Sequence, residues 1–273
     1  GDLPYTSLDD VIDRALREDL SLGDATTDAL IPADLKGVAN LVARNKGVLA
    51  GAQAACHVFQ KVDPKIEAVP LLEDGLHIEP GQIIARVSGP MNGILKGERT
   101  ALNLLQRMSG IASDTNRYVA AVQGLDVRIV DTRKTVPGHR YLDKYSVRMG
   151  GGFNHRMNLA DGILIKDNHI QANSFREMGL KDVIELALSS ASHTIKVEVE
   201  VESMDQVKAA LEAGANIIML DNMTVEEMAA AMKVIGDDAI VEASGGITYD
   251  TVRAVAETGV DLISIGGLTH SVN

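Results

Sequence analysis

A regular alternation of short apolar segments with helical segments fills the chain after about residue 126. Six segments have the length and composition of strands: 127–130, 162–165, 195–199, 216–220, 239–242 and 261–265. Five of the six are dominated by apolar residues, as expected for strands buried on both faces of a parallel sheet. Segments rich in Ala, Glu, Leu and Met separate them, for example 203–212 and 224–234. The pattern predicts right-handed βαβ units, and a spacing of roughly 20 to 25 residues in the last four units favours a barrel over an open doubly wound sheet.

The chain before residue 116 has a different character. Strand patterns at 37–44, 66–72 and 83–88 are separated by Gly and Pro, and a helical pattern covers 98–111. A further amphipathic helix is expected after Ser7, which we take as its N-cap. With 273 residues the chain is long enough for two modest domains. We therefore predict an α/β domain over 1–115 and an α/β barrel domain over 116–273.

Composition excludes several classes of partner. The formal net charge of −12 argues against general binding to nucleic acid or to membrane surfaces, which both favour positive proteins. No apolar run approaches the ~20 residues that a membrane span needs. The single cysteine, Cys56, rules out an internal disulfide and suits a reducing, cytoplasmic location. We expect Cys56 to be a small core residue.

Polar residues or glycine follow the predicted strands of the barrel domain. They are Asp131, Lys166, Glu200, Asp221, Ser244 and Gly266. In α/β barrels the active site is built at the carboxyl ends of the strands. These residues are therefore expected to converge in space.

Positive charge is concentrated between residues 131 and 169. This stretch holds seven Lys/Arg against four Asp/Glu, a balance of +3 in an acidic chain. The candidate anion-binding residues are Arg133, Lys134, His155, Arg156 and Lys166. Arginine pairs bidentately with carboxylates, and lysine acts as a compact charge, so the set suits a substrate with several carboxylates or carboxylates plus phosphate. The alternative is a group of surface charges paired with Asp143, Asp161 and Asp167.

Acidic residues and glycine-rich turns form the other half of the candidate site. Glu200 and Asp221 can hold Mg²⁺ with a pyrophosphate, accept hydrogen bonds from ribose, or stabilise positive charge on a sugar ring. Glu198, Glu200 and Glu202 share one strand face, and burying all three is costly, so Glu202 is expected to face solvent. The turns at 244–247 and 266–270 offer backbone N–H groups to phosphate.

Two other functions remain open from these residues alone. One is a Schiff-base lyase or aldolase that uses Lys134 or Lys166 as its nucleophile. The other is a phosphosugar-binding protein without catalytic activity.

Seven ordered motifs together resemble one enzyme family, quinolinate phosphoribosyltransferase. They are Asp131-Thr-Arg-Lys-Thr, Gly151-Gly-Phe-Asn-His-Arg, Leu164-Ile-Lys-Asp-Asn-His, Glu198-Val-Glu-Val, Met219-Leu-Asp-Asn, Glu242-Ala-Ser-Gly-Gly-Ile and Gly266-Gly-Leu-Thr-His. The resemblance implies an open, seven-stranded α/β barrel with an N-terminal α/β sandwich domain. It also implies conversion of quinolinate and phosphoribosyl pyrophosphate to nicotinate mononucleotide, pyrophosphate and CO₂ in de novo NAD biosynthesis. A related phosphoribosyltransferase-like protein of molybdenum-transport gene clusters shares much of this pattern.

The resemblance also implies roles for individual residues. Lys134, Lys166, Glu200 and Asp221 are expected to be catalytic, and Glu200 and Asp221 to bind Mg²⁺. The expected substrate-binding residues are Arg133, His155, Arg156, Ser244, Gly245, Gly266 and His270. Arg99 is expected to reach the neighbouring subunit's site in a homodimer or a higher homo-oligomer.

Overall fold

The computed structural model describes residues 2–273, and the chain divides into two compact units. Unit 1 contains the described residues up to Asn116, together with Lys134–Gly152 and Gly267–Asn273. Unit 2 contains Arg117–Arg133 and Phe153–Gly266. Both units are mixtures of helix and strand, as the sequence predicts, while the boundary between residues 115 and 116 remains a prediction.

Unit 1 contains two small antiparallel sheets. The larger has the strand order β1 (Lys36–Val42), β5 (Ile83–Pro90) and β3 (Glu67–Pro70), and the smaller pairs β2 (Gly47–Val48) with β4 (His77–Ile78). All three strands predicted in this part of the chain are present.

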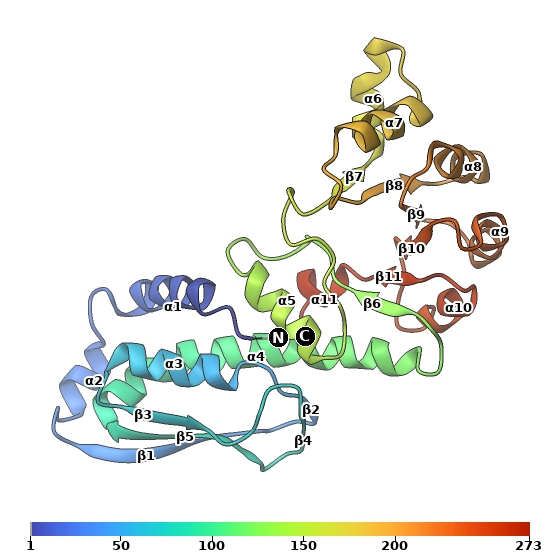
Figure 1. Ribbon diagram of the computed structural model, residues 1–273. Helices are drawn as coiled ribbons and strands as arrows, with labels where there is room; N and C mark the ends of the chain where they lie inside the picture. The colour runs from blue at the N-terminus through green and yellow to red at the C-terminus, as the bar shows by residue number, and fades with distance from the viewer. Residues whose placement is uncertain (1) are drawn as a thin grey trace. The chain divides into compact units, whose positions relative to one another are not determined.

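Helices pack against the larger sheet of unit 1 (Figure 1). The helices of this unit are α1 (Tyr5–Leu20), α2 (Ala25–Leu30), α3 (Ala52–Val62), α5 (Arg140–Met149), α11 (Gly267–His270) and most of α4 (Met91–Ala121). Helix α3 contacts β3 and β5, and α1 contacts α3 and α5. The predicted helix at 98–111 is therefore the middle of a much longer one.

The core of unit 1 is built mainly from aliphatic residues, with the rings of Phe59 and Tyr145. Phe59, Leu8, Ile12 and Met108 are almost completely buried, and Cys56 is buried beside them as predicted. This arrangement removes the apolar faces of α1, α3 and α4 from water, which is the main favourable term in folding.

Helix α1 begins earlier than the sequence predicts. Its first backbone hydrogen bond runs from Leu8 N to Pro4 O at 2.9 Å, and Pro4 occupies the N-cap position. Ser7 therefore lies inside the first turn, and its predicted capping role is wrong. Proline is tolerated at this boundary because its missing N–H needs no helical partner there.

Unit 2 contains one parallel sheet of six strands. The order is β6 (Arg128–Val130), β11 (Leu262–Ser264), β10 (Ile240–Ser244), β9 (Ile217–Asp221), β8 (Val197–Val201) and β7 (Ile163–Ile165). These are the six strands predicted from the sequence. Within the described residues β6 and β7 lie at the two ends of the sheet, and a parallel bridge between Val130 and Phe153 extends the β6 end.

Helices connect the strands of unit 2. They are α6 (Asp167–Asn173), the 3₁₀ helix η1 (Ser174–Arg176), α7 (Leu180–Ser190), α8 (Met204–Ala213), α9 (Val225–Ile235) and α10 (Val252–Glu257). Helices α7 to α10 lie side by side along one face of the sheet (Figure 1). The side chains of Ser203 and Thr224 accept hydrogen bonds from the first turns of α8 and α9, which fixes where these helices begin.

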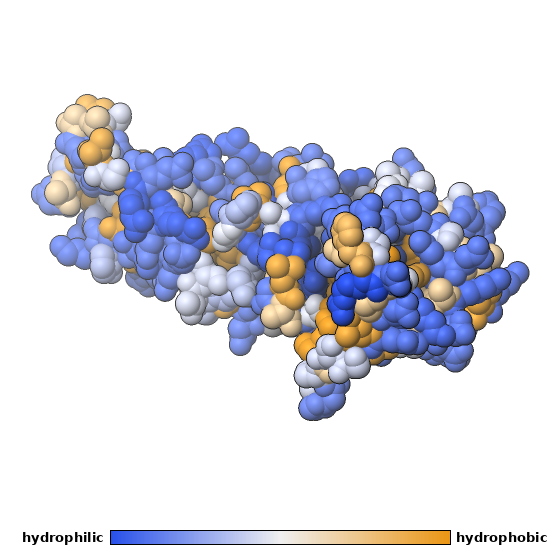
Figure 2. All heavy atoms as spheres, turned by 90° about the horizontal axis from the view of Figure 1, so that it is seen from above, coloured by the Kyte–Doolittle hydropathy of each residue, from blue (hydrophilic) through white to orange (hydrophobic). Residues whose placement is uncertain are grey.

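The surface reflects the acidic composition. On the face that Figure 2 shows, hydrophilic residues predominate and apolar residues lie among them in smaller groups. Among residues 2–273, no helix combines the length and the apolar character that crossing a bilayer requires.

Candidate active site

The sheet of unit 2 has one apolar face and one polar face. On β8, Val197, Val199 and Val201 are fully buried, and α7 and α8 pack against this strand. Successive side chains of a strand point to opposite faces, so Glu198 and Glu200 lie on the other side. The same alternation places Asp221 of β9 and Glu242 and Ser244 of β10 on that face. Glu202 is exposed beyond the end of β8, as predicted.

Lys166, Glu200 and Asp221 interact at the carboxyl ends of three neighbouring strands. Lys166 directly follows β7, Glu200 is near the end of β8, and Asp221 ends β9. Burial raises the pKa of Glu200, Lys166 lowers it, and Asp221 raises it again. An ammonium group and two carboxylates therefore share one half-buried environment.

The turn after β10 packs tightly on the end of β9. Asp221 and Ser244 are paired in the sheet register, and Asn222 N donates to Ser244 O at 3.1 Å. Gly245 has a φ of +88°, and a Cβ added there would lie 2.8 Å from Asp221 Oδ1 and closer still to the Asn222 side chain. Only glycine fits this position without displacing Asp221.

Asp131 fixes the segment that carries His155. The buried Asp131 carboxylate accepts hydrogen bonds from His155 N at 2.8 Å and from Asn154 Nδ2 at 2.6 Å. Phe153 N also donates to Ile129 O at 2.8 Å, which ties the segment to β6. The backbone at residues 153–155 is thereby held beside the end of the first strand of the sheet.

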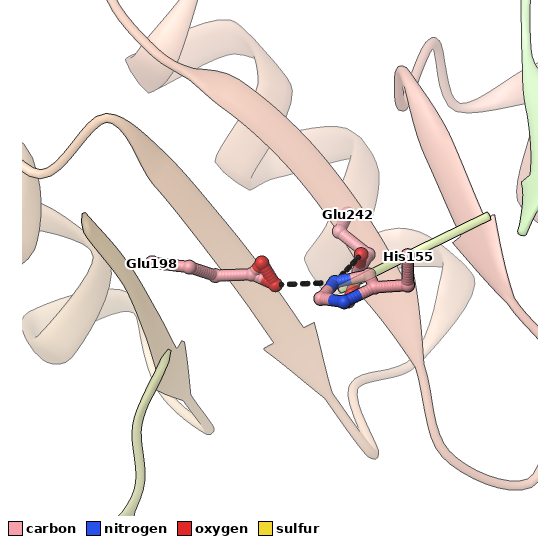
Figure 3. A group of neighbouring side chains, drawn as sticks. All are labelled: His155, Glu198 and Glu242. Carbon is pink, nitrogen blue, oxygen red and sulfur yellow. Dashed lines mark hydrogen bonds and ion pairs between the residues drawn. The ribbon is translucent and has the colours of Figure 1, made fainter. Parts of the chain in front are cut away.

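His155 lies between two buried glutamates (Figure 3). Its Nε2 is 3.1 Å from Glu198 Oε1 and 2.9 Å from Glu242 Oε1. Burial opposes the charged ring, but the contacts with Glu198 and Glu242 outweigh it and raise the pKa of His155 to about 10. Burial likewise raises the pKa of Glu242, against the effect of the His155 hydrogen bond. The ring is therefore an imidazolium at neutral pH.

Two arginines contribute further positive charge. Burial lowers the pKa of Arg156, Arg133 lowers it further, and Glu198 and Glu200 raise it. The Arg156 guanidinium is thus influenced by Arg133 as well as by the carboxylates of β8. Two close arginines lower their mutual repulsion by binding an anion.

The structure brings nine of the predicted site residues together in unit 2, towards the carboxyl ends of the strands. They are Arg133, His155, Arg156, Lys166, Glu200, Asp221, Ser244, Gly245 and Gly266. The other three belong to unit 1. There Lys134 is exposed and its carbonyl accepts from Thr269 Oγ1 at 2.8 Å, His270 is exposed at the end of α11, and Arg99 is exposed on α4.

Sequence reasoning did not assign roles to Asp131, Glu198 and Glu242. Each is buried and contacts the His155 segment. The sequence could have pointed to Glu198 and Glu242, because each lies within a short, mostly apolar strand. Burying a carboxylate there costs free energy unless the carboxylate is paired.

Two family models match almost the whole chain. The N-terminal domain of quinolinate phosphoribosyl transferase matches residues 24–109, and its C-terminal domain matches residues 111–273.

Curated and solved proteins agree with the family models. The chain is 40% identical over 278 residues to the nicotinate-nucleotide pyrophosphorylase [carboxylating] of Mycobacterium leprae, covering 100% of this chain and 96% of the relative. It is 39% identical over 268 residues to the probable enzyme of the same name from Bacillus subtilis, covering 98% of this chain and 91% of the relative. The crystal structure of NadC from Streptococcus pyogenes superposes with a TM-score of 0.94 at 38% identity, covering 100% of this chain and 95% of that one. The chain therefore belongs to the quinolinate phosphoribosyltransferase family.

Proposed function

We propose that this protein transfers the phosphoribosyl group of phosphoribosyl pyrophosphate to quinolinate and releases pyrophosphate and CO₂. The product is nicotinate mononucleotide, an intermediate of de novo NAD biosynthesis. Besides family membership, one observation supports this reaction above all. Cations suited to a dicarboxylate and carboxylates suited to a metal-bound sugar share one end of the unit 2 sheet.

The cationic residues bind and orient quinolinate. Arg133 and Arg156 supply guanidinium groups, and His155 supplies an imidazolium. Together with Lys166 they match the two adjacent carboxylates of a pyridine diacid. Their task is to direct the pyridine nitrogen at C1 of the ribose, and such positioning is among the largest contributions that an enzyme makes.

Glu200 and Asp221 fit a magnesium ion. Mg²⁺ prefers hard oxygen ligands and is commonly held by one or two carboxylates together with substrate phosphates. The two side chains lie close enough for Asp221 to raise the pKa of Glu200, and a divalent cation would relieve this repulsion. When bound, Mg²⁺ would neutralise the leaving pyrophosphate.

The reaction requires two bond changes at positions that the protein orients. The pyridine nitrogen forms a bond to C1 as the bond from C1 to pyrophosphate breaks, and the electron pair leaves with pyrophosphate. Glu200 and Asp221 stabilise the positive charge that develops on the ribose. The ring is now cationic, so it stabilises the electron pair left when the adjacent carboxylate departs as CO₂, and that carbon then takes up a proton.

The glycine-rich turns bind the phosphate groups. Ser244 ends β10 and Gly245 follows it, while Gly266 lies just beyond β11. Backbone N–H groups in turns after the last strands of α/β barrels are a common phosphate site.

An assay with quinolinate, phosphoribosyl pyrophosphate and Mg²⁺ tests the reaction through release of CO₂. Arg133→Ala should lower kcat/KM for quinolinate by roughly 30-fold or more, since a hydrogen-bonded charge contributes about 2 kcal/mol. Arg176→Ala, which removes an exposed arginine of the same unit, is the matched control and should have little effect. Turnover of nicotinate in place of quinolinate, or equal losses in the two variants, would contradict the proposal.

We further propose a homo-oligomer in which Arg99 serves the site of the neighbouring subunit. Its exposure on α4 is compatible with this role. Arg99→Ala and Arg133→Ala subunits should each have little activity alone, but mixed dimers would contain one intact site. When equal amounts are mixed at random, half of the twofold dimers contain one subunit of each variant, and each of these dimers has one intact site of two. The mixture should therefore recover roughly a quarter of the wild-type activity. No recovery after subunit exchange would place Arg99 in its own subunit's site.

We propose a cytoplasmic location. The only thiol, Cys56, is buried, and burial raises its pKa to about 11, so it gives no sign of disulfide chemistry. Fractionation of cells should find the protein and its activity together in the cytoplasmic fraction.

A further inference from the structure

His155 makes both of its carboxylate contacts through a single ring nitrogen. Nε2 lies 3.1 Å from Glu198 Oε1 and 2.9 Å from Glu242 Oε1, and Figure 3 shows both contacts converging on it. The contact with Glu198 is a hydrogen bond, and the contact with Glu242 is an ion pair. A nitrogen that faces two carboxylate oxygens must carry a proton, because its lone pair would otherwise be repelled by both.

The two glutamates come from strands that are not neighbours. Glu198 belongs to β8 and Glu242 to β10, with β9 between them. Their side chains are 4% and 0% exposed. Buried carboxylates this close together are strongly unfavourable unless a positive charge lies between them. His155, whose backbone N is held by Asp131, supplies that charge.

The state of the second ring nitrogen decides what His155 can bind. With a proton on Nε2, a neutral imidazole has a lone pair on Nδ1, which repels a carboxylate. An imidazolium has a second N–H there, which attracts one. A histidine that binds a dicarboxylate substrate must therefore stay protonated at the pH at which the enzyme works.

We propose that Glu198 and Glu242 are positioning residues that hold His155 as a correctly oriented imidazolium for binding the carboxylates of quinolinate. This rests on the proposed function. Neither glutamate needs to touch the substrate, because both act through the ring.

The surroundings of the ring support a permanently charged state. Glu198 of β8 and Glu242 of β10 contact the ring, and the next residue in the chain, Arg156, is itself close to Glu198. Ser264 of β11 donates a hydrogen bond to Glu242 Oε2 at 3.5 Å. Although burial opposes the charge, the two glutamates raise the pKa of His155 to about 10. Without them the ring would have an ordinary histidine pKa of about 6.5, or a lower one.

Direct titration of the ring tests the first half of the proposal without reference to activity. His155 can be followed by NMR in protein labelled at histidine, with the signal assigned from the spectrum of His155→Gln. In the wild type the midpoint should lie above pH 9. In the double variant Glu198→Gln/Glu242→Gln, which keeps the shape of both side chains, it should fall to about 6.5 or below.

Steady-state kinetics of the same double variant test the second half. At pH 8 only about 3% of a histidine with a pKa of about 6.5 is protonated, so KM for quinolinate should rise roughly 30-fold. At pH 6 most of the ring is charged again, and KM should return to within about threefold of the wild-type value at that pH. KM for phosphoribosyl pyrophosphate should not change. The control Glu212→Gln/Glu226→Gln removes two exposed charges from helices of the same unit and should behave as wild type.

Three results would overturn the proposal. The first is a wild-type His155 that titrates near pH 6.5, which decides the matter even if the double variant fails to fold. The second is a loss of quinolinate affinity that is equal at pH 6 and pH 8, since this indicates a structural role. The third is a divalent ion bound by His155, Glu198 and Glu242, detected by metal analysis, which would replace the Nε2 proton. If the wild type fails to turn over quinolinate, the proposed function fails, while the titration still reports on the cluster.

Discussion

Gly245→Ala is the substitution whose effect on the site can be worked out most fully. Two costs are expected. The residue has a φ of +88°, and placing alanine in this left-handed region should lower the free energy of unfolding by about 1–2 kcal/mol. In addition, the new methyl group would lie 2.8 Å from Asp221 Oδ1, so Asp221 must move by several tenths of an ångström or more. A misplacement approaching 1 Å in a catalytic site costs about 10²-fold in rate.

Gly259→Ala is a matched control in the same unit. Gly259 has a φ of +92°, and the nearest atom to an added Cβ is Met232 Cε at 4.0 Å. The two variants share the backbone penalty and differ in the clash. Urea titrations should therefore show that the free energy of unfolding falls by about 1–2 kcal/mol in the control and by at least as much in Gly245→Ala. Release of CO₂ should fall about 100-fold for Gly245→Ala only. If kcat/KM of the two variants agrees within about threefold, the close approach of Gly245 to Asp221 has no catalytic importance.

Three further predictions concern unit 1. Arg107 donates to both oxygens of the fully buried Asp143, so Arg107→Leu should lower the free energy of unfolding by about 3–5 kcal/mol in urea titrations. Burial already raises the pKa of Asp143, and losing Arg107 raises it further, so at low pH the folded variant keeps this carboxyl protonated and uncharged. The decrease in the free energy of unfolding should therefore be larger at pH 8 than at pH 5. A decrease that does not depend on pH would contradict this reasoning. Tyr145→Phe should lower the free energy of unfolding by about 1–3 kcal/mol, because Tyr145 donates to Asp74 Oδ2 at 2.6 Å; no change in the unfolding midpoint would contradict it. Cys56 should react with a thiol reagent at pH 7.5 only after unfolding, because it is buried and its pKa is raised to about 11; rapid labelling of the native protein would show otherwise.

The strands of unit 2 could be predicted because their apolar residues recur with a regular spacing. All six are present, and Ser203 and Thr224 cap the helices predicted at 203–212 and 224–234. The helix start at Pro4 could not be predicted, since local preference alone favours Ser7 as the cap. The prediction also covered only the middle of α4, which contains Gly93 and Gly97 as well. An added Cβ at Gly97 would lie 3.0 Å from Phe59, so that glycine permits close packing against α3.

The location of the site could be predicted from the residues that follow each strand. Lys166, Glu200, Asp221 and Ser244 lie at neighbouring carboxyl ends of the sheet, where parallel strands bring them. What could not be predicted is which carboxylates serve His155. Glu198 and Glu200 are two residues apart on the same strand face, and only the fold shows that the first is buried against the imidazole.

The make-up of unit 1 has a consequence for biosynthesis. Its third segment, Gly267–Asn273, includes Thr269, whose carbonyl accepts a hydrogen bond from Arg107 at 3.2 Å. A ribosome delivers the chain in order, so Arg107 cannot meet its partner until Thr269 has left the ribosome. During that interval the helices of the amino-terminal half present unfinished surfaces, which are prone to non-native association. Nascent chains halted before residue 267 should thus depend on chaperones more than chains that include residues 267–273 do.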